Sequence, residues 1–158
     1  QKVRDEHTET YLSWFGPYTN TLEFDYIYDF LKPQKDETVV DLGCGPCVMY
    51  ENKQVSLIGV DWSVEALKQA RIHYPFGTYI HGDASNTGLP TGQFDTIVAC
   101  GLLDYFDNWD PVIIEARRLL KDVGKFYATL LKSFNNHDWS SYPHIVGNWH
   151  LAVFSKEE

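Results

Sequence analysis

The stretch VVDLGCGPCVMY, residues 39–50, constrains the fold more than any other part of this sequence. It places a glycine-rich loop directly after a short apolar run, Thr38–Leu42, which predicts a buried strand. A second run, Ser56–Val60, leads into Asp61, about twenty residues after Asp41. In α/β folds this arrangement is typical of nucleoside binding, because a glycine loop lets the ligand approach the backbone and a carboxylate accepts from ribose hydroxyls.

The rest of the chain continues the alternation of helix and strand patterns. Helices are predicted over residues 20–31, 63–70 and 110–124, with Asn20, Ser63 and Asp110 as their caps. Further strands are predicted over residues 78–81, 94–100, 125–131 and 148–154. This alternation predicts one domain, residues 1–158, with a Rossmann-like doubly wound, mostly parallel sheet and helices on both faces. The last strand, in a hairpin around Gly147-Asn148, predicts an antiparallel C-terminal edge.

The charge balance bears on the partners. The formal net charge is −9 at pH 7, and no basic run is longer than Arg117-Arg118, so nucleic acid is disfavoured and a small molecule, a cationic one included, is favoured. No apolar run approaches the ~20 residues of a membrane span, so no membrane contact is expected. Three cysteines without a secretory signal favour a reducing compartment, and hence a cytoplasmic location.

The tetrapeptide Cys44-Gly-Pro-Cys47 also fits a thioredoxin-type redox motif. Thioredoxins place that motif after a Trp, whereas this chain has Gly43, so the redox interpretation is kept only as a less favoured alternative.

A nicotinamide dinucleotide site would need a third glycine where the chain has Val48. A cofactor with a ribose but no phosphate does not need that third glycine. The two cysteines also lack the partners of a metal site, so no metal is expected.

Five stretches, in order, resemble the motifs of the class I S-adenosylmethionine-dependent methyltransferases: VVDLGCGP, LIGVDWSVEAL, YIHGDASNTGLPTGQFDTIVACGLLDYF, EARRLLKDVGKFYATLL and NWHLAVFSKE. The likeness extends from about Asn20 to Lys156. It implies a methyltransferase that uses S-adenosylmethionine, releases S-adenosylhomocysteine and acts on a small-molecule acceptor. The DNA amino methyltransferases carry an Asn/Asp-Pro-Pro-aromatic signature after the fourth strand, where this chain has CGLLDY, so a DNA substrate is disfavoured.

The resemblance also implies roles for individual residues. The cofactor contacts lie at predicted strand ends: Asp41, Gly43 and Gly45 around the methionine part, Asp61 at the ribose hydroxyls, Trp62 and Asp83 at the adenine, Ala84 through its backbone, and Cys100 and Gly101 beside the sulfonium. The candidate acceptor contacts are Leu102, Asp104 and Tyr105. Tyr11 is a candidate cofactor or acceptor contact, in an aromatic segment within residues 1–19 for which a lid and a cover for the sheet are equal alternatives. His137 is the candidate general base, because a histidine titrates near neutral pH.

Three departures from the family pattern favour a rival hypothesis. One is that the region between the fifth and last predicted strands is brief, so the sixth strand is expected to be reduced or absent. The family usually has a glycine at the position of Cys47, and the helix after the glycine loop is short. The last two concern the methionine end of the site. The rival is a non-catalytic protein that keeps the methyltransferase fold and binds a ligand.

Overall fold

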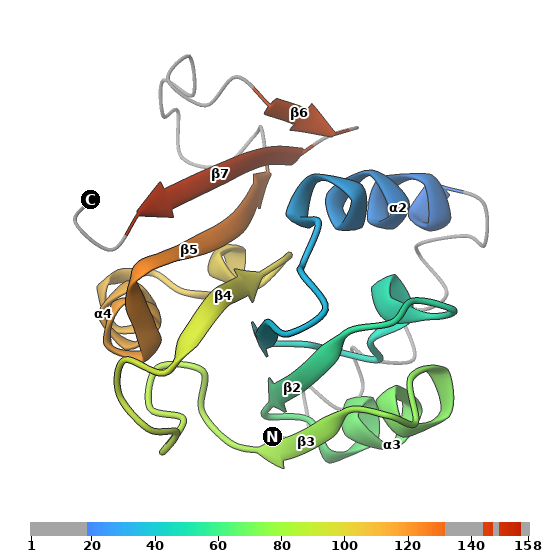
Figure 1. Cartoon of the computed structure of the whole chain (residues 1–158), viewed down its shortest axis with the longest axis horizontal. Coiled ribbons are helices and arrows are strands. Elements are labelled where there is room, and N and C mark those ends of the chain that lie inside the picture. The colour runs from blue at the N-terminus through green and yellow to red at the C-terminus, as the bar shows by residue number, and fades with distance from the viewer. Residues whose placement is uncertain (1–18, 132–143, 147–148, 156–158) are drawn as a thin grey trace.

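The computed structural model describes residues 19–131, 144–146 and 149–155. Its centre is a seven-stranded sheet in the order β3-β2-β1-β4-β5-β7-β6 (Figure 1). The strands are β1 (Thr38–Leu42), β2 (Ser56–Asp61), β3 (Thr78–His81), β4 (Phe94–Ala99), β5 (Leu120–Leu131), β6 (His144–Val146) and β7 (Trp149–Ser155). The helices are α2 (Thr19–Leu31), α3 (Val64–His73) and α4 (Asp110–Leu119), with short 3₁₀ turns η1 (Val48–Tyr50) and η2 (Leu103–Tyr105).

The sheet reverses its winding between β1 and β4. Strands β1 to β5 are parallel, with β1 flanked by β2 on one side and by β4 on the other. This is the switch point of a doubly wound sheet, where ligands bind beyond the carboxyl ends of the strands. β7 runs antiparallel to both β5 and β6, and β6 forms the outer edge of the sheet. The predicted Rossmann-like α/β class is confirmed.

Successive strand residues point to opposite faces of the sheet, and each face has its own apolar core. Val39 and Val98 pack with buried residues of α2 and α3, whereas Val40 and Ile97 pack with those of α4. The period of two is that of a pleated strand. Figure 1 shows the same division, with α4 on one side of the sheet and α2 and α3 on the other. The predicted covering of both faces is therefore confirmed.

Several predicted boundaries agree with the structure. β1 and β3 match the predicted strands residue for residue, and α2 ends at Leu31, shortly before Pro33. Ser63 caps α3, because its Oγ accepts a hydrogen bond from the N–H of Ala66 at 3.1 Å. This bond satisfies one of the donors that the first turn of a helix leaves free.

The largest boundary error concerns the end of α4 and the start of β5. The helix was predicted to reach Gly124 and the strand to begin at Lys125, but β5 begins at Leu120. The pairing of β4 with β5 shifts from Phe94–Leu120 to Thr96–Lys125, so extra residues of β5 bulge out. A Cβ on Gly124 would lie 2.8 Å from Leu120 Cδ2 and 3.0 Å from Phe94 O. This glycine lets the strand return close to β4 and does not end a helix.

Three smaller predictions also differ. Asn20 lies inside α2, which the structure describes from Thr19, and does not precede it. Trp109, one residue before the predicted Asp110, is the N-cap of α4. No helix joins β3 to β4 in residues 82–93, so the alternation of strand and helix is incomplete.

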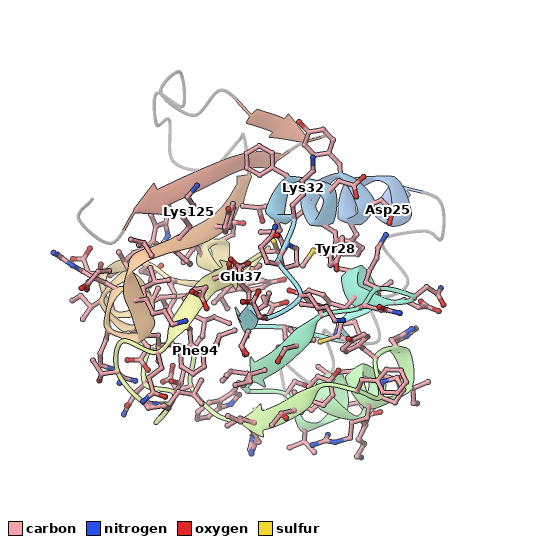
Figure 2. The ribbon with its side chains drawn as sticks, viewed as in Figure 1. Asp25, Tyr28, Lys32, Glu37, Phe94 and Lys125 are labelled. Atoms are coloured by element: carbon pink, nitrogen blue, oxygen red, sulfur yellow. The ribbon has the colours of Figure 1, made fainter. Side chains whose placement is uncertain are left out.

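α2 is attached to the segment that follows the glycine loop. Lys53 Nζ lies 2.7 Å from Asp25 Oδ1 of α2 and 5.1 Å from the centre of the Tyr28 ring. The Tyr28 ring meets the Tyr50 ring edge-on at 6.3 Å. Figure 2 labels Asp25 and Tyr28 on this helix. Because η1 has only one turn, α2 supplies much of the apolar cover at this part of the sheet.

Candidate cofactor site

The predicted cofactor residues gather at the carboxyl ends of neighbouring strands. Asp41 is in β1, Asp61 ends β2, and Cys100 and Gly101 follow β4. Asp41 pairs with Gly59 on one side and with Val98 on the other, so β1 lies at the centre of the group. The structure thus brings these residues to the switch point of the sheet.

The glycine loop has two positions that require or exploit the absence of a side chain. Gly43 has a φ of +68°, and a Cβ there would lie 2.6 Å from Leu102 Cδ1, so Gly43 allows the loops after β1 and β4 to touch. Gly45 has a φ of +53°, and a Cβ there would meet nothing within 4 Å, so its backbone faces open space. The N–H groups of Gly43 and Cys44 both donate to Val60 O, at 2.8 and 3.1 Å, and fix the loop against β2.

Asp61 holds the glycine loop and the start of α3 together. Its Oδ2 accepts a hydrogen bond from the N–H of Gly45 at 2.8 Å, and its Oδ1 accepts one from the N–H of Ser63 at 2.7 Å. A carboxylate oxygen can accept more than one hydrogen bond. The arrangement fits the ribose role that the resemblance implies for Asp61.

The predicted adenine contacts lie at the ends of β2 and β3. Trp62 is 41 % exposed, and its ring lies 6.1 Å from that of His81, whose Nε2 is 2.9 Å from Trp62 O. Asp83 Oδ1 accepts from both the N–H and the Oγ of Ser85, at 2.8 and 2.7 Å, while Ala84 is buried. An exposed indole after one strand and a fixed carboxylate after the neighbouring strand suit a purine, which stacks through its face and donates from its amino group.

The loop after β4 is anchored by a hydroxyl that the sequence analysis did not identify. The N–H of Gly101 donates to Thr129 Oγ1 of β5 at 2.7 Å, and Thr129 is buried. Burial and the charge of Asp41 raise the pKa of the Cys100 thiol. A hydrogen bond with Thr129 lowers this pKa by less, so the net pKa is raised. Cys100 is therefore a neutral wall of the site. Only the parallel pairing of β4 with β5 places Thr129 beside Gly101.

The predicted acceptor residues are divided between described and undescribed parts of the chain. Leu102 touches Gly43 and precedes η2, which carries Asp104 and Tyr105. Tyr105 is 62 % exposed, and partial burial and the charge of Asp104 raise the pKa of its phenol. Tyr11, His137 and residues 1–18 of the candidate lid lie outside the described residues.

Asp41 and Tyr50 form a buried pair that the sequence analysis identified only in part. Asp41 is 4 % exposed and Tyr50 is 0 % exposed. Burial raises the pKa of Asp41 to about 7, the Tyr50 hydroxyl lowers it, and the charge of Asp61 adds to the rise. The Tyr50 hydroxyl acts on this carboxyl but completes no hydrogen bond of ordinary geometry within the described residues. Tyr50 had no signal of its own in the sequence, because its place depends on packing against α2 and α3.

The geometry of Cys44 and Cys47 disfavours the redox interpretation. Both are free and buried, and the interaction with Cys47, followed by burial, raises the pKa of the Cys44 thiol well above its usual value. Reactive cysteines need a lowered pKa and access to solvent. Cys47 has a φ of 57°, a left-handed conformation that favours glycine, which explains why a glycine suits this position in the family.

A second buried acid, Glu115 of α4, holds the loop that follows Asp83 and was missed in the sequence. Its Oε1 accepts from the N–H and Oγ1 of Thr87, at 2.8 and 2.6 Å. Arg118 donates to both carboxylate oxygens, each at 2.7 Å, and to Thr91 Oγ1 at 2.8 Å. The i, i+3 spacing of Glu115 and Arg118 was the one available signal.

Two further features concern ions and membranes. Within the part of the chain that the structure describes, no three His, Cys, Asp or Glu side chains gather closely enough to hold a metal ion. None of the helices described here is long and apolar enough to span a membrane.

Comparison with known proteins agrees with this geometry. The profile of a methyltransferase domain family matches residues 40–128. The chain is 28 % identical over 120 residues to a ubiquinone biosynthesis O-methyltransferase of Nitrosomonas europaea, a match that covers 70 % of this chain and 51 % of that protein. The enzyme with the same name from Vibrio atlanticus is 26 % identical over 127 residues, which cover 75 % of this chain and 54 % of that protein. The chain thus spans about half the length of these relatives.

A solved structure shows the same fold over nearly the whole chain. A TehB-like SAM-dependent methyltransferase from Corynebacterium glutamicum superposes with a TM-score of 0.73 at 18 % identity, covering 95 % of this chain and 98 % of that one. The matched family segment contains the glycine loop, Asp61, Asp83 and the end of β4, and S-adenosylmethionine is the cofactor of this class. Because that segment is more than half of the 158 residues, the chain belongs to the methyltransferase domain family.

Proposed function

We propose that this protein is an S-adenosylmethionine-dependent methyltransferase that acts on a small-molecule acceptor. One observation carries the proposal: the Asp61 carboxylate is bracketed by the N–H groups of Gly45 and Ser63 at the switch point, beside a glycine backbone that faces open space. A nucleoside cofactor needs such a carboxylate for its ribose and a bare backbone for the group attached to the 5′ carbon.

The described residues fit this cofactor along its whole length. In the proposal, Asp61 accepts from the ribose hydroxyls, and Trp62, Asp83 and Ala84 hold the adenine. Asp41, Gly43 and Gly45 surround the methionine part, with Cys100 and Gly101 beside the sulfonium. Support comes from the exposed face of Trp62, the ordered carboxylate of Asp83 and the empty space at Gly45.

The chain's contribution to the reaction is orientation and exclusion of water. A sulfonium methyl group is already activated, so the cofactor supplies the chemistry and the protein aligns the acceptor for in-line displacement. The loop that carries Leu102, Asp104 and Tyr105 is fixed beside the glycine loop and is the proposed acceptor contact. Tyr11 and His137 stay predictions as an acceptor contact and a general base.

The relatives point to the atom that is methylated. Both are named O-methyltransferases, so we take a hydroxyl oxygen as the acceptor atom here. The net charge of −9 supports a small molecule over nucleic acid. The free cysteines support a cytoplasmic location. We also take residues 1–158 as one domain, with the antiparallel strands β6 and β7 closing its sheet and residues 1–19 as a lid.

A non-catalytic, ligand-binding protein is the second candidate. It is favoured by the single-turn η1 and by the strained Cys47, which both lie at the methionine end of the site. Binding alone does not separate the two candidates, whereas transfer of a labelled methyl group does.

The first experiment is calorimetric titration of the protein with S-adenosylmethionine and S-adenosylhomocysteine. We expect micromolar binding that Asp61→Asn weakens at least tenfold, because the amide loses acceptor capacity toward both the loop and the ribose. Asp95→Asn is the matched control, since Asp95 pairs with Lys121 and lies in β4 away from the switch point. Absence of binding at millimolar ligand would refute the proposal. A panel of hydroxyl-bearing small molecules with methyl-labelled cofactor then decides between enzyme and binding protein.

A further inference from the structure

The Asp41 carboxyl group is buried near the end of β1, and the described residues bring no cation to it. Asp41 is 4 % exposed. Among the described residues, no Lys or Arg side chain forms an ion pair with it, and the Tyr50 hydroxyl is the neighbouring group that lowers its pKa. Removing a carboxylate from water without a positive partner is unfavourable, so such a group either takes up a proton or binds a cation.

Within the described part of the chain, the groups that face Asp41 bring no positive charge. They are Asp61 from β2, Tyr50 from η1, Cys44 in the glycine loop and Cys100 after β4. The thiols and the phenol have raised pKa values and are neutral near pH 7, so Asp61 is the charged neighbour. Burial raises the pKa of Asp41 to about 7. Its carboxyl group is therefore protonated in part of the molecules at physiological pH.

The proposed cofactor and its product differ in charge at the sulfur, which belongs to the methionine part that Asp41 would face. S-adenosylmethionine carries a positive sulfonium, whereas the sulfur of S-adenosylhomocysteine is a neutral thioether. We propose that Asp41 carries a proton in part of the ligand-free molecules and releases it to solvent when the sulfonium cofactor binds, so that preference for cofactor over product grows with pH. This inference rests on the proposed cofactor site. Tyr50 is a positioning residue in it, because it acts through Asp41.

The size of the effect follows from linkage. An opposite charge within about 4–6 Å lowers a carboxyl pKa by roughly 1–3 units. With a drop of about 2 units from about 7, the affinity for S-adenosylmethionine rises about twentyfold between pH 5.5 and 7.5. The product keeps its ammonium group but lacks the sulfonium, so we expect its affinity to rise by less than about threefold.

The test is calorimetric titration of both ligands at pH 5.5, 6.5 and 7.5, in two buffers with different ionisation enthalpies. The difference between buffers counts the protons released. For the wild type we expect release of a fraction of a proton with S-adenosylmethionine at pH 6.5, and less with S-adenosylhomocysteine. Asp41→Asn should abolish both the release and the pH dependence of the affinity ratio. Asp95→Asn, which removes a carboxylate paired with Lys121, should keep both.

Tyr50→Phe gives an independent readout. The Tyr50 hydroxyl lowers the pKa of Asp41, so removing it should move the rise in affinity to higher pH while the aromatic packing stays in place. A merely structural role would weaken binding equally at every pH. Tyr74→Phe is the control, because the Tyr74 hydroxyl donates to Val55 O at 2.6 Å and does not act on Asp41.

The outcomes separate this inference from the proposed function. If the wild type binds S-adenosylmethionine and Asp41→Asn keeps the same pH dependence, the inference is wrong and the proposed function stands. If the wild type binds neither ligand at any pH, the proposed function fails, and the inference fails with it. If circular dichroism shows that Asp41→Asn does not fold, Tyr50→Phe decides, and an unshifted pH profile overturns the inference.

Discussion

The hydrogen bonds of Glu115 predict a specific loss of stability in acid. Glu115 is buried, and burial alone would raise its pKa, but the bonds from Arg118 and Thr87 outweigh burial and lower the pKa from 4.5 to about 2. Because the folded-state pKa lies below the unfolded value, this stabilisation is complete above about pH 4.5 and is lost as the pH falls toward 2. One pKa unit is worth about 1.4 kcal/mol, so the total is ~3 kcal/mol, of which about 2 kcal/mol is lost by pH 3.

The assay is urea unfolding of the wild type and Glu115→Gln at pH 7 and pH 3. We expect the wild type to be more stable at pH 7 by about 2–3 kcal/mol, since the variant leaves Arg118 without its charged partner. By pH 3 this difference should shrink by about 2 kcal/mol. Glu65→Gln removes an exposed pair with Lys68 at the same i, i+3 spacing, and should change stability by less than about 0.5 kcal/mol at either pH. An equal gap between wild type and Glu115→Gln at both pH values would refute the reasoning.

Three further predictions concern residues around the site. Gly59→Ala places a Cβ 2.7 Å from Cys44 Sγ, so we expect the free energy of unfolding to fall by about 1–3 kcal/mol in chemical unfolding. An unchanged midpoint would contradict this, because it would mean that the glycine loop moves away from the new methyl group at no cost. Thr129→Val removes the buried oxygen that accepts from the N–H of Gly101, and should cost about 1–3 kcal/mol in the same assay, whereas Thr129→Ser should recover most of it. Ser63→Ala removes the cap of α3 and should cost about 1 kcal/mol; a loss below about 0.3 kcal/mol would contradict the capping role, and Ser63→Asp should restore stability.

The parts of the fold that follow from local pattern were predictable from the sequence. β1 and β3 agree with their apolar runs, because a buried strand is a short continuous signal. Asp61 and the glycine loop were found from their spacing, since parallel pairing of β1 with β2 places the ends of the two strands side by side. The cap at Ser63 is a local hydrogen bond and needs no tertiary information.

The parts that depend on contacts between distant segments could not be predicted in this way. Thr129 lies next to Gly101 only through the pairing of β4 with β5. Tyr50 reaches Asp41 because η1 is covered by α2. The early start of β5 was missed, since a helical period and a bulged strand look alike over a few residues when a glycine follows.

The hydrogen bond from Gly45 to Asp61 means that the glycine loop is ordered before any ligand arrives. A loop fixed during folding loses little further conformational freedom on binding, so more of the contact energy appears as affinity. The same carboxylate is the proposed ribose partner. Substitutions at Asp61 therefore remove a ligand contact and also remove the hydrogen bond that fixes the glycine loop. The affinity lost in Asp61→Asn is therefore the sum of a contact and a preorganisation contribution, and ligands without ribose hydroxyls, such as a methionine-like fragment, should report the second alone.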